Sequence, residues 1–420
     1  MSACQDAPKN SAQDLLRSGH FQALAEMLEQ LQDKTLAQIP PECVDAALTW
    51  QVDQCRFDDV NALYQRAQRL EISVELPRGL AQQMMRMNRP SDAVDLLNEW
   101  RATDNKDAAS FAKQVLALQT MRADQAALSI CKKARTKFPS NDQLALSEVI
   151  LSLRLGVVEP VLDTLKALSS RRDQPLWIHA LLRALQSDEI DAMGLSLSVP
   201  RELVSPKIIL SLARGLYEIH ERNALLANLM PHDRVLELGT GLGAMACWAN
   251  QRQPEVPFVS IEANPSLAPL IMENFKRNNC TAQAISGVAA LHEGYTEFNI
   301  EGDFWASSQV TGSPMSTSVK LPCVSIPDLL AEFRPTIMVV DIEGAEADLL
   351  PGLSLQSVRR LIVEMHPQFI PLADCAKLWR KLIDDGFYPQ QAKGSDKVVV
   401  WNRITDSKAH PSEIQKGSSQ

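Results

Sequence analysis

The chain has 420 residues, of which 45% are hydrophobic and 22% are charged, with a formal net charge of -9 and a pI near 5.4. This length exceeds one ordinary hydrophobic core and predicts two domains in a globular protein. The acidic balance argues against broad electrostatic binding to nucleic acid or to anionic membranes, so we expect neither as a partner.

The eight cysteines form no CxxC pair and no Cys/His group with zinc spacing. We interpret them as reduced core thiols, which are typical of a cytoplasmic protein. The amino-terminal residues are polar and lack the apolar stretch of a signal peptide, and no apolar run reaches the roughly 18 residues of a membrane span. The sequence therefore predicts a cytoplasmic location.

Residues 10–190 contain little glycine, and Leu, Ala, Gln and Arg recur with a period that predicts helices throughout. Similar segments begin at Arg56, Arg89, Arg122 and Gly156, about 33 to 34 residues apart. Units of this length are typical of helix pairs that bury their apolar sides by stacking on their neighbours. They resemble degenerate tetratricopeptide repeats, and an irregular helical bundle is the alternative. We expect this domain to bind a protein partner, to mediate self-association or to act as a spacer.

Residues 191–230 predict a linker with two prolines, followed by one amphipathic helix that ends near Pro231. Residues 231–403 alternate short apolar runs with helical segments, which predicts an α/β domain with a parallel sheet covered on both faces. The polar tail at 404–420 is expected to be disordered. The predicted strands are RVLEL, FVSIE, AQAIS, TIMVVD, RLIVEM and KVVVW.

The segment RVLELGTGLG, residues 234–243, is a strand that ends in alternate glycines before a helix. This arrangement places backbone amides and the positive end of a helix against a ligand. We expect Gly239 to allow the tight turn, and Gly241 and Gly243 to keep Cβ atoms out of the path. The loop also fits a dinucleotide fingerprint, and Glu262 ends the next strand, where a ribose-binding acid belongs in either case. The loop alone therefore leaves a nicotinamide-dependent dehydrogenase open.

Glu237 stands two residues before the first glycine, and E-x-G-x-G-x-G resembles motif I of class I S-adenosylmethionine (SAM) methyltransferases. Residues 234–401 then resemble the FkbM-type methyltransferase family, segment by segment and in order. The first loop departs from the family pattern, since Glu237 replaces an Asp and Gly241 replaces an Asn. The segments that carry the resemblance are VLELGTGLG, VSIEANPSLAPLIMENFKRNN, GVAALHEGYTEFNI, VKLPCVSIPDLL, IMVVDIEGAEADLLPGL and RLIVEMHP, of which DIEGAE is the most distinctive.

The resemblance implies a Rossmann-like seven-stranded sheet with SAM as cofactor. Glu262 would accept the ribose hydroxyls from the carboxyl edge of the sheet, and the SGVAA segment would lie beside the adenine. The residues that we assign to cofactor binding are Glu237, Gly239, Thr240, Gly241, Gly243, Glu262, Ala263, Asn264, Gly287, Val288 and Asp341.

Asp341 ends the buried strand TIMVV, where a carboxylate is costly unless it meets water, a cation or a hydrogen-bond donor. Glu343 follows two residues later, and Glu364 and His366 end the next parallel strand. Methyl transfer to a hydroxyl requires a base for the acceptor's proton, so we predict that these four residues are catalytic. Glu346 either lines the site or is an acid favoured at a helix N-terminus. A divalent metal held by these groups is an alternative, and we assign no metal ligand.

Residues 303–318, rich in Ser, Thr and Gly with Trp305 as the large anchor, are expected to form a mobile lid or acceptor loop. These features predict a SAM-dependent methyltransferase, most consistent with O-methylation of a small molecule, a sugar or other glycan, or a protein-borne hydroxyl. Two alternatives remain open: a non-catalytic binding protein whose methyltransferase fold is degenerate, and an NAD-dependent oxidoreductase.

Overall fold

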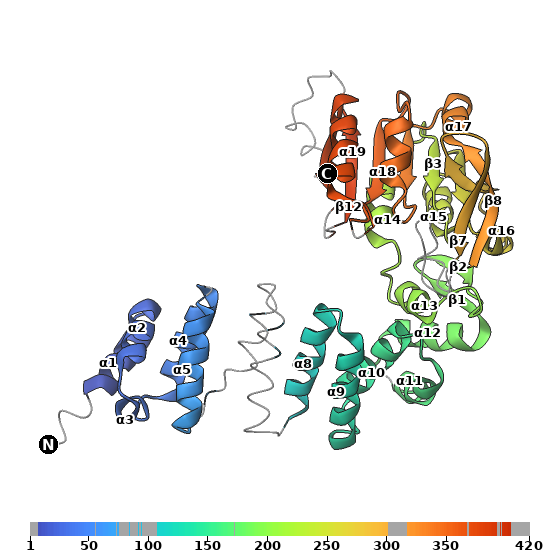
Figure 1. The fold of residues 1–420 in the computed structure, drawn as a ribbon. Coiled ribbons are helices and arrows are strands. Elements are labelled where there is room, and N and C mark those ends of the chain that lie inside the picture. The colour runs from blue at the N-terminus through green and yellow to red at the C-terminus, as the bar shows by residue number, and fades with distance from the viewer. Residues whose placement is uncertain are drawn as a thin grey trace, which may run out of the picture. The chain divides into compact units, whose positions relative to one another are not determined.

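The computed structural model describes residues 7–54, 56–72, 107–171, 173–300, 317–367, 369–392 and 397–404, and positions 74, 84, 91, 94 and 395. The chain divides into two compact units, Met1–Arg171 and Arg172–Gln420 (Figure 1). In the described part of the chain, no helix has the length and apolar character needed to cross a membrane.

The first unit is helical in its described residues, as the sequence predicts. Three of the similar segments, those at Arg56, Arg122 and Gly156, each lead into one helix, and most of the segment at Arg89 lies outside the described residues. The grouping of these helices into tetratricopeptide-like units stays a prediction. The helices are α1 (Ala7–Arg17), α2 (Phe21–Gln30), α3 (Asp33–Leu36), α4 (Pro41–Asp53), α5 (Phe57–Arg69), α8 (Ala108–Thr120), α9 (Asp124–Lys137), α10 (Asp142–Arg154) and α11 (Leu162–Ser169).

Helix α9 shows how the first unit forms its core. Ala127, Leu128, Cys131 and Ala134 are buried and recur at helical spacing, so they form one apolar stripe. This stripe packs between α8 and α10, which flank α9 (Figure 1). The core of the first unit is therefore made by stacking of neighbouring helices, with small side chains at close contacts.

The second unit contains a seven-stranded sheet in the order β11-β12-β10-β9-β3-β4-β5. Strands β3, β4, β5, β9 and β10 are parallel, and β12 runs antiparallel to both of its neighbours. The α/β prediction is confirmed, and all six predicted strands are present. The strands are β3 (Val235–Leu238), β4 (Phe258–Glu262), β5 (Gln283–Ser286), β9 (Ile337–Val340), β10 (Arg360–Glu364), β11 (Phe387–Gln391) and β12 (Val398–Arg403).

Helices cover this sheet, and a second, three-stranded sheet lies beside it in the order β6-β8-β7. Every residue of β3 and of β9 is buried, which is why both strands are continuous apolar runs in the sequence apart from Glu237. The remaining elements are α15 (Ala244–Arg252), α16 (Ala268–Arg277), β6 (Val288–Ala290), β7 (Gly294–Ile300), β8 (Thr317–Ser325), α17 (Ile326–Phe333), α18 (Glu346–Leu349) and α19 (Leu372–Asp384).

The junction between the predicted domains differs from the prediction. Helix α12 (Leu176–Ser187) belongs to the second unit because it packs on the hairpin β1–β2 (Glu189–Ala192, Leu195–Ser198) and on α13 (Pro206–Ala213). The predicted domain boundary at residue 190 therefore falls inside a compact unit. The predicted linker at 191–230 contains the end of β1 and the whole of β2. Neither strand was predicted from the sequence.

The single amphipathic helix expected before Pro231 is two helices, α13 and α14 (Ile219–Leu226). Gly215 ends the first helical stretch with a left-handed backbone, at φ +72°. Glu218 then caps α14, also with a left-handed backbone at φ 45°. The break lets residues between the two helices reach the sheet edge. Residues 405–420 of the tail expected to be disordered at 404–420, and residues 303–316 of the expected lid, lie outside the described residues.

Candidate active site

The candidate site lies at the carboxyl edge of the central parallel strands. Strand β3 pairs with β4 on one side and with β9 on the other, so the chain order of the strands reverses at β3. Ligands of open α/β sheets bind in the crevice outside the strand ends at such a point. A cavity of about 90 Å³ that opens to solvent is found there. Its lining residues are Tyr217, Glu218, Gly239, Gly241, Ile261, Glu262, Ala263, Gly287, Val288, Ala289, Phe298, Asp341, Ile342, Glu343 and Ala345.

The three glycines of the first loop have three different roles. A Cβ on Gly239, whose φ is +89°, would lie 1.8 Å from the backbone oxygen of Asp341, so this glycine is required by the neighbouring strand end. A Cβ on Gly243 would lie 2.8 Å from Cε1 of Phe275 on α16, so this glycine permits helix packing. Gly241 lines the cavity, with φ 53°. Gly239 and Gly241 therefore line the cavity, whereas Gly243 serves the packing of α16.

Glu262 connects the glycine loop to the end of β4. Its Oε2 accepts the N–H groups of Thr240 (3.1 Å) and Gly241 (3.0 Å), and its Oε1 accepts the N–H of Asn264 (2.7 Å). Burial raises the pKa of Glu262, although these backbone N–H groups oppose the rise. The carboxylate borders the cavity and fixes the loop that forms its floor.

The cavity is largely apolar beyond Glu262. Ile261, Val288, Ala289 and Phe298 line this part, together with Ala263. Two of the predicted cofactor residues stand behind the surface: Thr240 is 1% exposed, and Asn264 is 5% exposed with its Oδ1 accepting the N–H of Ser266. This part of the cavity offers apolar contacts, and the carboxylate of Glu262 offers a hydrogen-bond acceptor beside them.

Glu237 does not line the cavity, although the sequence analysis places it at the cofactor. Its side chain is 2% exposed and accepts the hydroxyl hydrogen of Ser260 at 2.7 Å. Burial raises its pKa well above the usual range, and the carboxylates of Glu218 and Glu262 raise it further. The buried strand β3 directs this side chain to β4, which a sequence pattern does not reveal.

Asp341 and Glu343 line the opposite part of the cavity, in the loop after β9. Glu343 has a left-handed backbone, at φ 50°, which is uncommon for a residue with a Cβ and costs of order 1 kcal/mol or more. Burial raises the pKa of Glu343 to about 7, with His366 opposing the rise and Glu364 and Glu346 adding to it. Burial also raises the pKa of Asp341 well above its usual value, and Glu364 and Glu343 add to this effect.

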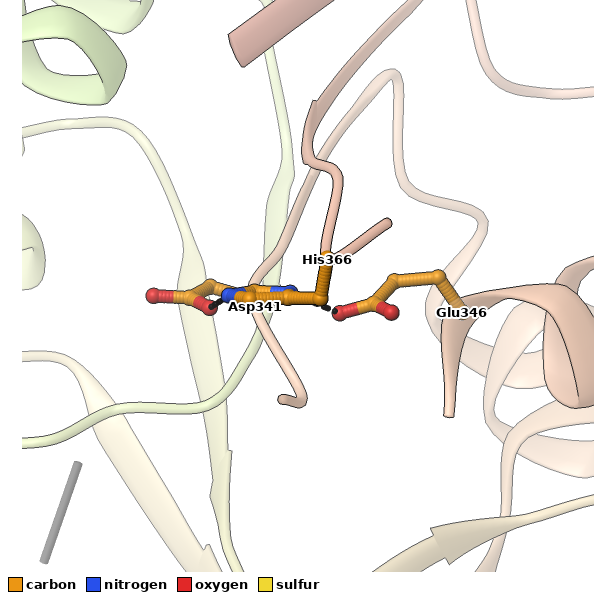
Figure 2. A group of neighbouring side chains, drawn as sticks. All are labelled: Asp341, Glu346 and His366. Atoms are coloured by element: carbon orange, nitrogen blue, oxygen red, sulfur yellow. Dashed lines mark hydrogen bonds and ion pairs between the residues drawn. The ribbon is translucent and has the colours of Figure 1, made fainter. Parts of the chain in front are cut away.

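Figure 2 shows His366 between the carboxylates of Asp341 and Glu346. The Nδ1 of His366 is 3.0 Å from Oε1 of Glu346, and its Nε2 is 3.3 Å from Oε2 of Glu343 and 3.6 Å from Oδ1 of Asp341. Glu346 is fully buried and also accepts the N–H groups of Ile342 (3.1 Å) and Gly344 (3.0 Å). Glu346 therefore holds both the 341–345 loop and the imidazole ring.

His366 is a buried partner of carboxylates in this structure. Its side chain is 3% exposed, and it does not line the cavity. Burial lowers the pKa of its imidazole, but the hydrogen bond and charge of Glu346 and the charge of Glu343 outweigh burial, so the pKa is raised overall. Glu364, also predicted to be catalytic, lies 4.0 Å from His366 and 3.5 Å from Nζ of Lys397, and it does not line the cavity either.

Asp341, Glu346 and His366 are close enough together for one metal ion, as the metal alternative requires. Glu346 already accepts backbone N–H groups and holds Nδ1 of His366, so an ion at this point would be bound by Nε2 of His366 and the carboxylate of Asp341, with Glu346 as the support of the ring. The arrangement is a hydrogen-bond network that organises the acidic side of the cavity.

The structure therefore brings together Gly239, Gly241, Glu262, Asp341 and Glu343 at one cavity, with Ala263, Gly287 and Val288. Tyr217 and Glu218 also line this cavity, and neither was predicted from the sequence. The only sequence signal for them is Gly215, which marks the end of the preceding helix.

Residues 244–387 match the family model described as the methyltransferase FkbM domain. No curated protein sequence matches the chain. Solved structures similar to the chain include a precorrin-6y C5,15-methyltransferase from Geobacter metallireducens GS-15, with 11% identity, coverage of 44% of this chain and 89% of that chain, and a TM-score of 0.28. A ribosomal protein L11 methylase from Lactobacillus delbrueckii subsp. bulgaricus has 14% identity, coverage of 44% and 77%, and a TM-score of 0.27. M. jannaschii TYW2 in complex with AdoMet has 13% identity, coverage of 51% and 86%, and a TM-score of 0.28.

Proposed function

We propose, on the premise that residues 244–387 form a methyltransferase FkbM domain that uses SAM, that this chain methylates a hydroxyl group. When bound, SAM supplies a methyl group on a sulfonium, which an oxygen nucleophile attacks in line. The protein must therefore orient the acceptor and remove its proton. The residues after β9 are placed for both tasks.

The observation that carries this proposal is the pair of carboxylates on the cavity wall, Asp341 and Glu343, backed by His366. A carboxylate whose pKa is raised to about 7 is suited to accept a hydroxyl proton near neutral pH. We assign this role to Glu343. Asp341 would orient the acceptor hydroxyl.

His366, one of the four residues predicted to be catalytic, then acts through the carboxylates instead of on the acceptor. Its ring is held at Nδ1 by Glu346, and its Nε2 faces Glu343 at 3.3 Å. A protonated imidazole in this position stabilises the ionised form of Glu343 before the acceptor binds. His366 and Glu346 are therefore positioning residues.

The cofactor assignment is supported by the shape and chemistry of the cavity. The carboxylate of Glu262 borders the cavity beside the backbone N–H groups that it accepts, and we assign to it the binding of a ribose hydroxyl. Val288, Ala289 and Phe298 would pack against the adenine. Gly241 lets the rest of the cofactor approach the backbone of the loop.

The acceptor class and the role of the helical unit complete the proposal. The acceptor is a small molecule, a glycan or a protein-borne hydroxyl, and the stacked helices of the first unit bind a partner or a second copy of the chain. Stacked helical units present extended surfaces, which suits such a role.

The test is a methyl-transfer assay with purified full-length protein, SAM and two matched acceptor panels, one with hydroxyl groups and one with amines. Production of S-adenosylhomocysteine (SAH) with a hydroxyl acceptor, and its loss in the Glu343→Gln variant with SAM binding retained, supports the proposal. Turnover with amine acceptors alone contradicts O-methylation. SAM binding without turnover on any acceptor supports the non-catalytic alternative.

A further inference from the structure

Two residues of the cavity wall come from the segment before β3, ahead of both the glycine loop and the matched residues 244–387. Tyr217 and Glu218 lie between α13 and α14, more than twenty residues before the start of the match at residue 244. They line the same cavity as Gly239, Gly241 and Asp341. The segment before β3 is therefore part of the binding site in this protein.

The local structure fixes both side chains. Tyr217 is 1% exposed, its ring lies 6.5 Å from the ring of Trp248, and its hydroxyl is hydrogen-bonded to Glu218 and to the backbone of Leu242 in the glycine loop. The left-handed backbone of Glu218 at φ 45° turns the chain at this point. Tyr217 thus ties the carboxylate of Glu218 to the loop that borders the cavity.

The charges along the cavity are unevenly distributed. Glu218 and Glu343 are close enough to Asp341 for their charges to raise its pKa, so these three acids form one group, whereas Val288 and Phe298 pack against Ala263, the neighbour of Glu262, and form an apolar group. No lysine or arginine lines the cavity in the part of the chain that the structure describes. Burial raises the pKa of Glu218 to about 8, the hydrogen bond from Tyr217 opposes this, and Glu221 and Glu364 add to it. A ligand with a neutral ring system at one end and positive charge at the other matches this distribution.

We propose that Glu218 binds the α-ammonium group of the amino-acid part of SAM, an assignment that depends on the cofactor of the proposed function. Glu262 marks the ribose position, and Glu218 belongs to the acidic group with Asp341, separate from the apolar group. In SAM, the amino-acid part extends from the sulfur away from the adenosine ring system. The ammonium is thereby directed to the end of the cavity where Glu218 lies.

The experiment compares three ligands by calorimetry on the full-length protein. SAM carries both a sulfonium and an ammonium, SAH carries only the ammonium, and 5′-methylthioadenosine carries neither. We expect Glu218→Gln to weaken SAM and SAH alike by about tenfold or more, and to leave 5′-methylthioadenosine within about twofold. Tyr217→Phe should weaken SAM and SAH by a smaller factor, because it only loosens Glu218.

Glu221→Gln is the matched control, since Glu221 is a buried acid on α14 that does not line the cavity. We expect it to change the affinity for SAM by less than about threefold. Retained binding of 5′-methylthioadenosine shows that the variants are folded. Weakening of SAM alone would place Glu218 at the sulfonium and overturn the assignment, and so would unchanged affinity or equal weakening of all three ligands. If the wild-type protein binds none of the three, the cofactor assignment itself fails.

Discussion

Replacement of Glu262 by alanine tests how the carboxyl edge of the sheet holds a ribose. Glu262 accepts three backbone N–H groups at 2.7–3.1 Å, from Thr240, Gly241 and Asn264, and it borders the cavity. A hydrogen bond to a charged group contributes about 1.5–3 kcal/mol. Loss of a single ribose contact should therefore weaken SAM by about 10- to 100-fold.

The substitution should also loosen the glycine loop, because two of the three N–H groups belong to it. We expect faster amide hydrogen exchange at Thr240 and Gly241, while strand β3 stays protected. Calorimetry with SAM and with its 2′-deoxy and 3′-deoxy analogues separates the two effects. One of the deoxy analogues should bind the wild-type protein more weakly than SAM does. The same analogue and SAM should bind Glu262→Ala with equal affinity.

The matched control is Glu255→Gln, an exposed acid in the turn before β4, which should bind SAM as the wild type does. If Glu262→Ala binds SAM within about twofold of wild type while its fold is intact, Glu262 makes no ribose contact. The assignment of the cavity to SAM would then lose its principal polar contact.

Three further predictions concern the loop, the base and the sheet. Gly239→Ala should abolish SAM binding and lower Tm, because a Cβ there would lie 1.8 Å from the Asp341 backbone oxygen; normal binding by calorimetry would contradict this. If Glu343 is the base, kcat/KM should rise with pH through about 7, since the carboxylate of the free enzyme must be deprotonated, and Glu343→Gln should remove this limb; an unchanged profile would exclude the role. Burial alone would raise the pKa of Asp233, but hydrogen bonds from Arg359 and neighbouring groups lower it overall. The ionised carboxylate therefore stabilises the fold above the unfolded pKa of about 3.9, and this stabilisation is lost as pH falls through the folded pKa. Asp233→Asn should cost about 3 kcal/mol at pH 7, measured by urea unfolding, with a smaller difference from wild type near pH 3; an equal difference at both pH values would contradict the linkage.

The sequence by itself determined the two kinds of structure and most strands of the main sheet. Buried parallel strands are continuous apolar runs, as in IMVV of β9, and amphipathic helices repeat their apolar residues every three to four positions, as in α9. These signals are local, so they can be recognised in the sequence without knowledge of the tertiary fold. The glycine loop and Glu262 were also recognised, because strand ends and turns have local signatures.

The tertiary structure decided which of the predicted residues share the cavity. Glu237 and Asp341 both stand at ends of buried strands, yet one side chain is directed to Ser260 and the other to the cavity. The direction of a side chain on a buried strand depends on which neighbours cover each face, and that is not encoded locally. Likewise, His366 was predicted to be catalytic and is enclosed by three carboxylates of the 341–346 segment.

The contribution of Tyr217 and Glu218 could be found only in three dimensions. Their segment has the periodicity of one helix, and the break at Gly215 and Glu218 is stable because packing on Trp248 and the bond to Leu242 hold it. Local propensity favours a continuous helix there, and tertiary contacts outweigh it. Contacts between distant parts of a chain produce no periodic pattern in its sequence. The acidic part of the cavity could therefore be recognised only in the tertiary structure.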